Sequence, residues 1–487
     1  PPLQNWLIAG ATLIRGECDT WAVRLPSAFA TLLTTLLIYG YSRTFLSRLG
    51  ALSAGAAYAT MIQVLQMGGQ GETDALLTLF IASSLLVWHW GMVQGWPAWQ
   101  TWMLAYGLAA LGALAKGPQA PIYLVAVVSV HSLVCGQWRR LFSGAHVLGV
   151  ATFAVLFGAW AVPYYLRMDA DGLRRILGDQ STTRFLSQDF RALLLHMPAF
   201  PLEVVGCLLP WSALLLAYLH RPFRERLGDA RPAVFFLWLC MVGTFPSCWI
   251  TPAARSRYYM PMYPCFAPLV GLVVQRYLDL PEGSVLRRGW SGYVSMCALI
   301  FVGVAALALG GGVAERLTGW QLAQPPAMAV GVAAALLAAA VLLFRLRQSF
   351  APAQIKLTVV CLASAFALSY SLWFMNILIN RKVDAPAEMA RLNEQLAGQR
   401  LVSLEPIHHL FAYYYQDPIP VLRFPQKEAD LPPDVTYFCL NVAGTEPQLP
   451  FAWERVAVIN CDRNVRPVPL VTVVVGRRIT ASPPNGR

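Results

Sequence analysis

Charged residues are scarce in this sequence. They make up 13% of its 487 residues, about half the share found in ordinary soluble proteins. Hydrophobic residues make up 57%, and the mean hydropathy is +0.51. Several soluble domains would need more charge than this to coat their surfaces. The composition therefore excludes soluble globular, disordered and fibrous classes and predicts a polytopic membrane protein.

The sequence also lacks the motifs of several enzyme classes. It has no Walker loop, no GxGxxG after a strand and no GxSxG elbow. Its ten cysteines form no CxxC pair, and most lie in apolar segments, where cysteine behaves as a small hydrophobe. His196 stands alone, and His408 and His409 have no further ligand at metal-binding spacing. We predict no metal site from these residues and no coupling to nucleotide hydrolysis.

Lys and Arg outnumber Asp and Glu by 37 to 25, a net charge of +12. Nucleic-acid binding needs such residues gathered on a polar face. Here they lie in short loops between apolar runs, so we expect no nucleic-acid partner. Twelve runs are long and apolar enough to predict membrane-spanning helices. The runs are 23–42, 50–67, 74–93, 98–115, 119–135, 145–166, 199–219, 233–251, 258–275, 290–311, 326–344 and 357–379.

Alternate loops between these runs differ in charge. One set holds 14 bases and four acids, and the opposite set, up to residue 379, holds 11 bases and ten acids. Loops rich in Lys and Arg stay in the cytoplasm, so the first set is predicted to lie inside. The chain would then start outside, at Pro1, without an initiator methionine or a signal peptide. We interpret this as a fragment with at least one helix upstream.

Residues 380–487 differ in composition, with 12 bases and 11 acids. Ala385–Ala397 and His408–Tyr415 have helical patterns, and Arg400–Leu404 is short and apolar. Three further segments are β-branched and aromatic, which is typical of strands: Val435–Leu440, Arg455–Ile459 and Leu470–Val475. We predict a small soluble α/β domain outside the membrane. Cys439 and Cys461 would be either free thiols or a disulfide there.

Ionisable residues at the outer membrane surface are costly and therefore candidates for function. Asp74 begins the run 74–93, where it could cap the helix or serve a catalytic site. Lys116 lies in a tight turn on the side that otherwise avoids bases in its short loops, as a snorkelling lysine or a ligand contact. Arg255 and Arg257 lie on the same side, where an anion such as a lipid phosphate would explain them. Pairing with lipid headgroups or with acids of the 167–198 loop is the alternative.

Five stretches then show a family resemblance. In order they are PPLQNWL (1–7), AVRLPSA (22–28), TDALL (73–77), AKGP (115–118) and SRYYMP (256–261). They resemble bacterial GT-C membrane glycosyltransferases, in particular the group of lipid A aminoarabinose transferases and protein O-mannosyltransferase-like enzymes. The resemblance implies a GT-C-like transmembrane catalytic domain over 1–379, with 167–198 as an outer interfacial loop, and a periplasmic α/β domain over 380–487.

The family implies an inverting transfer of a hexosyl or pentosyl group. The donor would be a sugar on polyprenyl (undecaprenyl) phosphate, and the acceptor lipid A, another glycolipid or a protein hydroxyl, at the periplasmic face of the bacterial inner membrane. By motif match Asp74 would be catalytic. Six residues would contact the donor phosphate or the lipid carrier: Lys116, Arg184, Arg255, Arg257, Tyr258 and Tyr259. We expect a monomer surrounded by membrane lipids.

Two features depart from the family pattern. Arg184-Phe185 resembles the family's RF pair, but Asp179-Gln180 precedes it where a His often stands. No cofactor is therefore assigned, and a requirement for a divalent metal stays open. The family's main catalytic Asp and a neighbouring Lys would lie upstream of Pro1. The alternatives are another protein that handles lipid phosphates, such as an O-antigen ligase or flippase, a transporter, or a non-catalytic scaffold.

Overall fold

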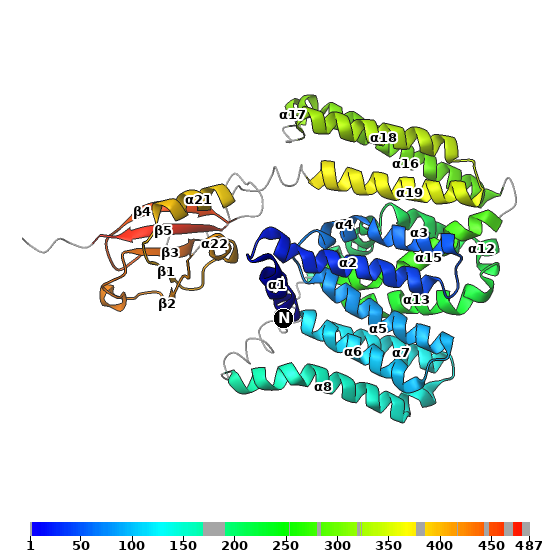
Figure 1. Cartoon of the computed structure of the whole chain (residues 1–487), viewed down its shortest axis with the longest axis horizontal. Helices are drawn as coiled ribbons and strands as arrows, with labels where there is room; N and C mark the ends of the chain where they lie inside the picture. The colour runs from blue at the N-terminus through cyan, green and yellow to red at the C-terminus, as the bar shows by residue number, and fades with distance from the viewer. Residues whose placement is uncertain are drawn as a thin grey trace, which may run out of the picture. The chain divides into compact units, whose positions relative to one another are not determined.

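A computed structural model gives the structure of the chain (Figure 1). It describes residues 2–168, 190–252, 254–279, 284–318, 322, 324–375, 385–415, 417–442, 448–461 and 471–479. Two compact units make up the chain. One comprises residues 1–310 and 324–373, and the other residues 311–323 and 374–487. The predicted domain boundary at 379–380 falls within 376–384, outside the described residues.

The first unit is helical. Its elements are α1 (Pro2–Arg15), α2 (Thr20–Ser42), α3 (Arg48–Ala59), α4 (Ile62–Gly68), α5 (Asp74–Gln94), α6 (Ala98–Lys116), α7 (Gln119–Val134), η1 (Trp138–Phe142), α8 (Gly144–Arg167), α11 (Phe190–Cys207), η3 (Trp211–Leu219), α12 (Arg221–Glu225), η4 (Gly228–Ala230), α13 (Arg231–Thr244), α14 (Pro246–Trp249), η5 (Ser256–Met262), α15 (Tyr263–Arg276), η6 (Tyr277–Asp279), α16 (Val285–Leu309), α18 (Pro326–Leu346) and α19 (Pro352–Leu368). A π-helical turn, η7 (Ser369–Phe374), follows α19.

Eight helical segments among the described residues are long and apolar enough to cross a membrane. They are Thr20–Ser42, Asp74–Gln94, Gly144–Arg167, Phe190–Cys207, Gly228–Trp249, Val285–Leu309, Pro326–Leu346 and Pro352–Phe374. The predicted class, a polytopic α-helical membrane protein with a small C-terminal α/β domain, is confirmed. The predicted count of about twelve spans is not.

Breaks inside apolar runs account for much of the difference in span count. The run 50–67 is two short helices, α3 and α4, because the backbone becomes extended at Met61. The run 258–275 begins with the 3-10 turn η5 and continues as α15, which has 14 residues. Pro261 and Pro264 lie at this junction and lack the N–H that a continuous helix would need.

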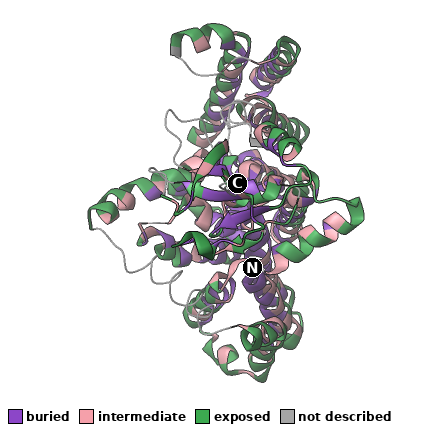
Figure 2. Cartoon of the chain, turned by 90° about the vertical axis from the view of Figure 1, so that its left-hand side faces the viewer, coloured by how far each residue is buried: buried purple, intermediate pink, exposed green. Residues whose placement is uncertain are grey.

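Burial places α5 at the centre of the helical unit and α8 at its edge. Most residues of α5 are buried, whereas in α8 only Gly149 is. Figure 2 colours the ribbon of the chain by the burial of each residue. An apolar helix that other helices do not cover faces lipid in a membrane protein. Helices α3 and α15 pack closely against each other. A Cβ on Gly271 of α15 would lie 2.3 Å from the carbonyl oxygen of Gly50 in α3, so only glycine fits there.

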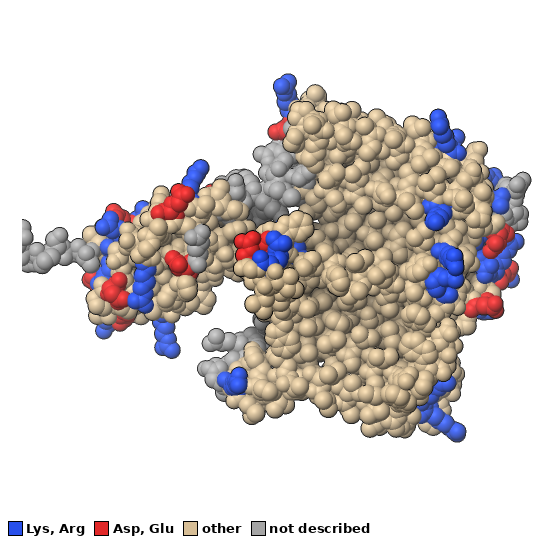
Figure 3. Space-filling model, in the orientation of Figure 1, with Lys and Arg blue, Asp and Glu red and all other residues tan. Residues whose placement is uncertain are grey.

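Charged side chains of the helical unit gather at its two ends. Figure 3 shows a broad belt without Lys, Arg, Asp or Glu between these ends on the visible face. Such a belt matches the hydrocarbon layer of a bilayer, where charge is costly. The unit therefore has the surface of an integral membrane protein.

The second unit contains a five-stranded sheet. It comprises α17 (Gly311–Thr318), α21 (Ala385–Gln395), β1 (Leu401–Leu404), α22 (His409–Tyr414), β2 (Val421–Leu422), η8 (Glu428–Asp430), β3 (Tyr437–Val442), β4 (Trp453–Asn460) and β5 (Thr472–Arg478). The strand order is β2-β1-β3-β5-β4. Strands β2, β1 and β3 are parallel, and β5 is antiparallel to both of its neighbours.

Both faces of this sheet carry apolar residues, as the alternation along its strands requires. Val473 and Val475 belong to one hydrophobic cluster and Val474 to the other. The predicted helices and strands of 385–475 are found within a few residues of their expected ends. Cys439 and Cys461 are not joined by a disulfide, so the disulfide alternative is wrong: the first lies in β3, the second follows β4, and β5 separates those strands.

Candidate functional site

An ion pair joins the first residue of α5 to the last residue of α6. Lys116 Nζ donates to the carboxylate of Asp74, whose side chain is only 3% exposed. The two helices are antiparallel neighbours of 21 and 19 residues, so the start of one lies beside the end of the other (Figure 1). The helix dipole favours a negative charge at the N-terminal end, where Asp74 lies in α5, and a positive charge at the C-terminal end, where Lys116 lies in α6. The capping alternative is not what the structure shows, because the carboxylate pairs with Lys116 and Thr73 makes no capping hydrogen bond.

Arg257 adds a second cation to this pair. It lies in η5, and its guanidinium forms an ion pair with Glu72. Its Nε lies 3.9 Å from Asp74 Oδ2, which is too long for a hydrogen bond, and this buried Nε has no hydrogen-bond partner among the described residues. Buried donors are nearly always paired in folded proteins. The unpaired Nε–H is therefore available to an anionic ligand.

Tyr258 lies against both cations. Lys116 Nζ is 4.9 Å from the centroid of the Tyr258 ring, and Arg257 Cζ is 5.8 Å from it. Gln119, the first residue of α7, donates to the Tyr258 carbonyl oxygen at 3.1 Å. We call Glu72, Asp74, Lys116, Arg257 and Tyr258 the outer cluster. Segments that are far apart in the sequence meet in it.

Buried polar contacts hold the η5 segment of the outer cluster. Gln63 of α4 donates to Ser256 Oγ at 3.3 Å and accepts from Tyr263 OH at 2.8 Å. Gln63 is 6% exposed, so these hydrogen bonds are shielded from water. The residue thus fixes both ends of the turn that carries Arg257.

The loop before Asp74 packs tightly on α2. Ser27 Oγ donates to the Glu72 carbonyl oxygen at 2.9 Å. A Cβ on Gly71 would lie 2.4 Å from a methyl group of Val23, so glycine is required for this approach. Gln4 of α1 also donates to the Gly71 carbonyl oxygen, at 3.3 Å. Residues of the PPLQNWL and AVRLPSA stretches therefore position the loop that presents Glu72 and Asp74.

The structure separates the predicted site residues into groups. Asp74, Lys116, Arg257 and Tyr258 lie together. Arg255 is exposed beside them in sequence and has no side-chain partner within the part of the chain that is described. Tyr259 is buried and donates to the Met241 carbonyl oxygen at 2.7 Å, away from the cluster. Arg184 lies outside the described residues.

Glu72 is the cluster member that was not singled out from the sequence. In the sequence, Glu72 is marked only by its position in the GETD stretch, two residues before Asp74, and it cannot be told there from an ordinary acidic loop residue. No group of three or more His, Cys, Asp or Glu side chains suited to a metal occurs among the described residues. The outer cluster is therefore a charge-balanced set of two carboxylates and two cations.

The comparisons with known proteins agree with the resemblance. The family described as dolichyl-phosphate-mannose-protein mannosyltransferase matches residues 1–162. An undecaprenyl phosphate-alpha-4-amino-4-deoxy-L-arabinose arabinosyl transferase of Erwinia tasmaniensis is 26% identical over 54% of this chain and 46% of its own length. A second such transferase, from Sodalis glossinidius, is 28% identical over 63% of this chain and 53% of its own. The chain spans about half the length of the curated relatives it matches.

A solved structure matches almost the whole chain. The crystal structure of ArnT from Cupriavidus metallidurans bound to undecaprenyl phosphate covers 98% of this chain and 87% of its own, with a TM-score of 0.67 and 18% identity. The chain therefore shares the fold of that transferase. The predicted resemblance to the aminoarabinose transferase group is thereby confirmed, with the short motifs and the overall fold in agreement.

Proposed function

We propose that this GT-C-like chain carries the sugar-transfer site of a membrane glycosyltransferase. The donor is a sugar on polyprenyl phosphate, and the acceptor is a hydroxyl of lipid A, another glycolipid or a protein. The observation that carries this proposal is the meeting of Asp74, Lys116 and Arg257 at one end of the helical unit. The relatives' names, which specify undecaprenyl phosphate and aminoarabinose, support the donor class.

The charges of the outer cluster suit a phosphate ligand. Its two cations are balanced by Asp74 and Glu72. The Arg257 Nε–H is still unpaired, and Arg255 adds an exposed positive charge. A sugar phosphodiester brings one negative charge, and the departing lipid phosphate carries more. Cations fixed where negative charge develops stabilise the transition state, typically by a factor of about 100 to 1000 for each donor.

The buried Asp74 carboxylate pairs with Lys116 and lies near Arg257. When the donor phosphate attracts these cations, the carboxylate becomes free to accept the proton of the acceptor hydroxyl. The acceptor oxygen then bonds to the sugar C1, and the C1–O bond to phosphate breaks with both electrons going to the phosphate oxygen. Attack opposite the leaving group inverts the configuration at C1.

The proposal extends to topology and domains. Residues 1–379 form the transmembrane catalytic domain of a monomer in the bacterial inner membrane. Residues 380–487 form a periplasmic domain. The bias of Lys and Arg toward the opposite loops supports this orientation.

Asp74→Asn in the full natural protein tests the proposal. We expect a loss of about 100-fold or more in sugar transfer, because general base catalysis contributes that much. Asp19→Asn is the matched control. Asp19 is another carboxylate, it lies just before α2, and it forms an ion pair with Arg15 and accepts a hydrogen bond from the Ala22 N–H, none of which belongs to the outer cluster. Unchanged transfer by Asp74→Asn would remove Asp74 from the mechanism.

A further inference from the structure

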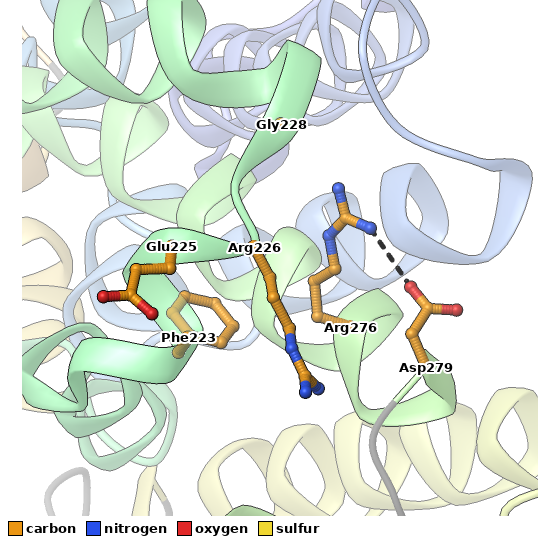
Figure 4. A pocket seen from close by; sticks show the side chains of 6 residues that line it. All are labelled: Phe223, Glu225, Arg226, Gly228, Arg276 and Asp279. Atoms are coloured by element: carbon orange, nitrogen blue, oxygen red, sulfur yellow. Dashed lines mark hydrogen bonds and ion pairs between the residues drawn. The ribbon is translucent and has the colours of Figure 1, made fainter.

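A second cluster of charge lies at a small surface pocket, separate from the outer cluster. The pocket has a volume of about 350 Å³ and is lined by Phe223, Glu225, Arg226, Gly228, Arg276 and Asp279. It lies where the turn of α12 and η4 meets the end of α15 and the turn η6 (Figure 4). None of these residues belongs to the outer cluster.

The acids at this pocket already have partners. Asp279 Oδ2 accepts from Arg276 NH1 at 3.2 Å. Glu225 pairs with Arg221 at 2.8 Å. Both carboxylates therefore have a cation of their own, and neither is left to neutralise Arg226.

Arg226 is the unbalanced charge. Its side chain is exposed and has no partner among the residues that the structure describes. Figure 4 shows its guanidinium pointing away from the Arg276–Asp279 ion pair. Arg276 also has a buried Nε–H without a hydrogen-bond acceptor among the described residues. The pocket thus presents one uncompensated guanidinium, that of Arg226, and guanidinium groups bind phosphate oxygens well.

The surroundings favour a phosphate held at the membrane surface. Phe223 contributes an aromatic wall and is 3% exposed. The segment Gly228–Trp249, which is long and apolar enough to cross a membrane, begins at the pocket. Residues 221–231 hold four arginines against two acids. Basic pockets at the ends of spanning helices on the cytoplasmic side are suited to anionic lipid headgroups.

We propose that this pocket binds a phosphate group, with Arg226 as the principal contact and the Arg276 side chain beside it. An anionic phospholipid of the adjacent leaflet and a soluble phosphate share this chemistry. This site is independent of the sugar-transfer proposal, because it uses other residues at another place in the helical unit.

Native mass spectrometry of the purified full protein tests the site. The probes are phosphatidylglycerol in phosphatidylcholine mixtures and, in a separate arm, inorganic phosphate followed by thermal shift. Arg226→Gln should weaken the phosphatidylglycerol association by about tenfold, and Arg226→Lys should restore part of it. Arg224→Gln is the matched control: it removes the same charge two residues away, is exposed and does not line the pocket.

Each outcome bears on the proposal. Loss of lipid binding in Arg226→Gln but not in Arg224→Gln supports a lipid ligand. An Arg226-dependent thermal shift with inorganic phosphate alone supports a soluble one. Equal losses in the two variants would show general attraction to basic loops and overturn the site, as would unchanged binding of both probes by Arg226→Gln.

Discussion

Lys116 and Asp74 form an ion pair across the open end of the α5–α6 hairpin, although 42 positions separate them in the sequence. The pair is partly shielded, because the Asp74 side chain is 3% and the Lys116 side chain 26% exposed. A buried carboxylate that loses its cation is costly, whereas removing both charges together is often tolerated. This asymmetry allows the structural role of the pair to be separated from its chemical role.

Lys116→Met should lower stability by about 1–3 kcal/mol, since it leaves the Asp74 carboxylate with only the distant Arg257 Nε. The double variant Lys116→Met/Asp74→Asn should recover much of that loss, yet it should remain inactive in sugar transfer. Thermal unfolding in detergent and a transfer assay on the same samples measure the two effects. Full activity in the double variant would mean that the pair serves only the fold.

Gln63→Met should reduce kcat/KM for the donor by about fivefold to tenfold. It removes two buried hydrogen bonds, each worth about 1 kcal/mol, that hold the turn carrying Arg257. Gln66→Met is the control, because Gln66 lies on the same helix and makes no side-chain hydrogen bond within the described residues. Equal effects of the two substitutions would argue against a positioning role for Gln63.

The cysteines offer a test of orientation. Cys18, between α1 and α2, and Cys135, which follows α7, are both exposed. The charge bias puts Cys18 outside and Cys135 inside. A membrane-impermeant maleimide applied to intact spheroplasts should therefore label Cys18 and leave Cys135 unlabelled until the membrane is opened. The reverse pattern would invert the proposed topology.

Cys439 should stay unlabelled in both of those conditions. Burial raises the pKa of its thiol to about 12, so the reactive thiolate is rare at neutral pH. Cys439 is also fully shielded from solvent. Labelling should appear only after denaturation, as mass spectrometry of the tryptic peptides can show.

Asp19 should make stability depend on pH in the acid range. Its hydrogen bond to Arg15, followed by that from the Ala22 N–H, holds the pKa of its carboxyl below the ordinary value of 3.8. The stabilisation is therefore present above that value and is lost as the pH falls through the lower pKa of the folded state. Asn also caps helices well, so Asp19→Asn removes mainly the charge. The gap in Tm between wild type and Asp19→Asn should be constant well above the ordinary pKa of 3.8 and should shrink as the pH falls below that value. A gap that does not change with pH would contradict the ion pair.

Part of the candidate site could be predicted from the sequence. Lys116 and Arg257 stand out because they are bases in short loops on the side that otherwise has few. Glu72 could not be singled out, since an acid two residues before Asp74 looks like any loop residue until Arg257 is seen beside it. Tyr258 and Tyr259 could not be distinguished either. A 3-10 helix has about three residues per turn, so the side chains of consecutive residues point about 120° apart. In η5 only Tyr258 faces the cations, and Tyr259 points elsewhere.

Part of the fold, too, could be predicted from the sequence and part could not. Long uninterrupted apolar runs such as 74–93 and 326–344 match single helices closely, because composition alone decides them. The run 50–67 does not, since the extended backbone at Met61 depends on contacts that hydropathy does not encode. In the C-terminal unit, the β-branched residues of strands such as β5 are enough to predict their positions, whereas their order in the sheet depends on long-range pairing.

The most direct test measures polyprenyl phosphate release and sugar transfer together, in membranes carrying the full natural protein or its Arg257→Gln variant. The wild type should release one polyprenyl phosphate for each sugar that reaches the acceptor. Arg257→Gln should lower kcat/KM for the donor by about 100-fold, as expected when a cation that stabilises the leaving phosphate is lost. Undiminished transfer by a folded Arg257→Gln variant, or no donor-dependent release by the wild type, would contradict a sugar-transfer site at the outer cluster.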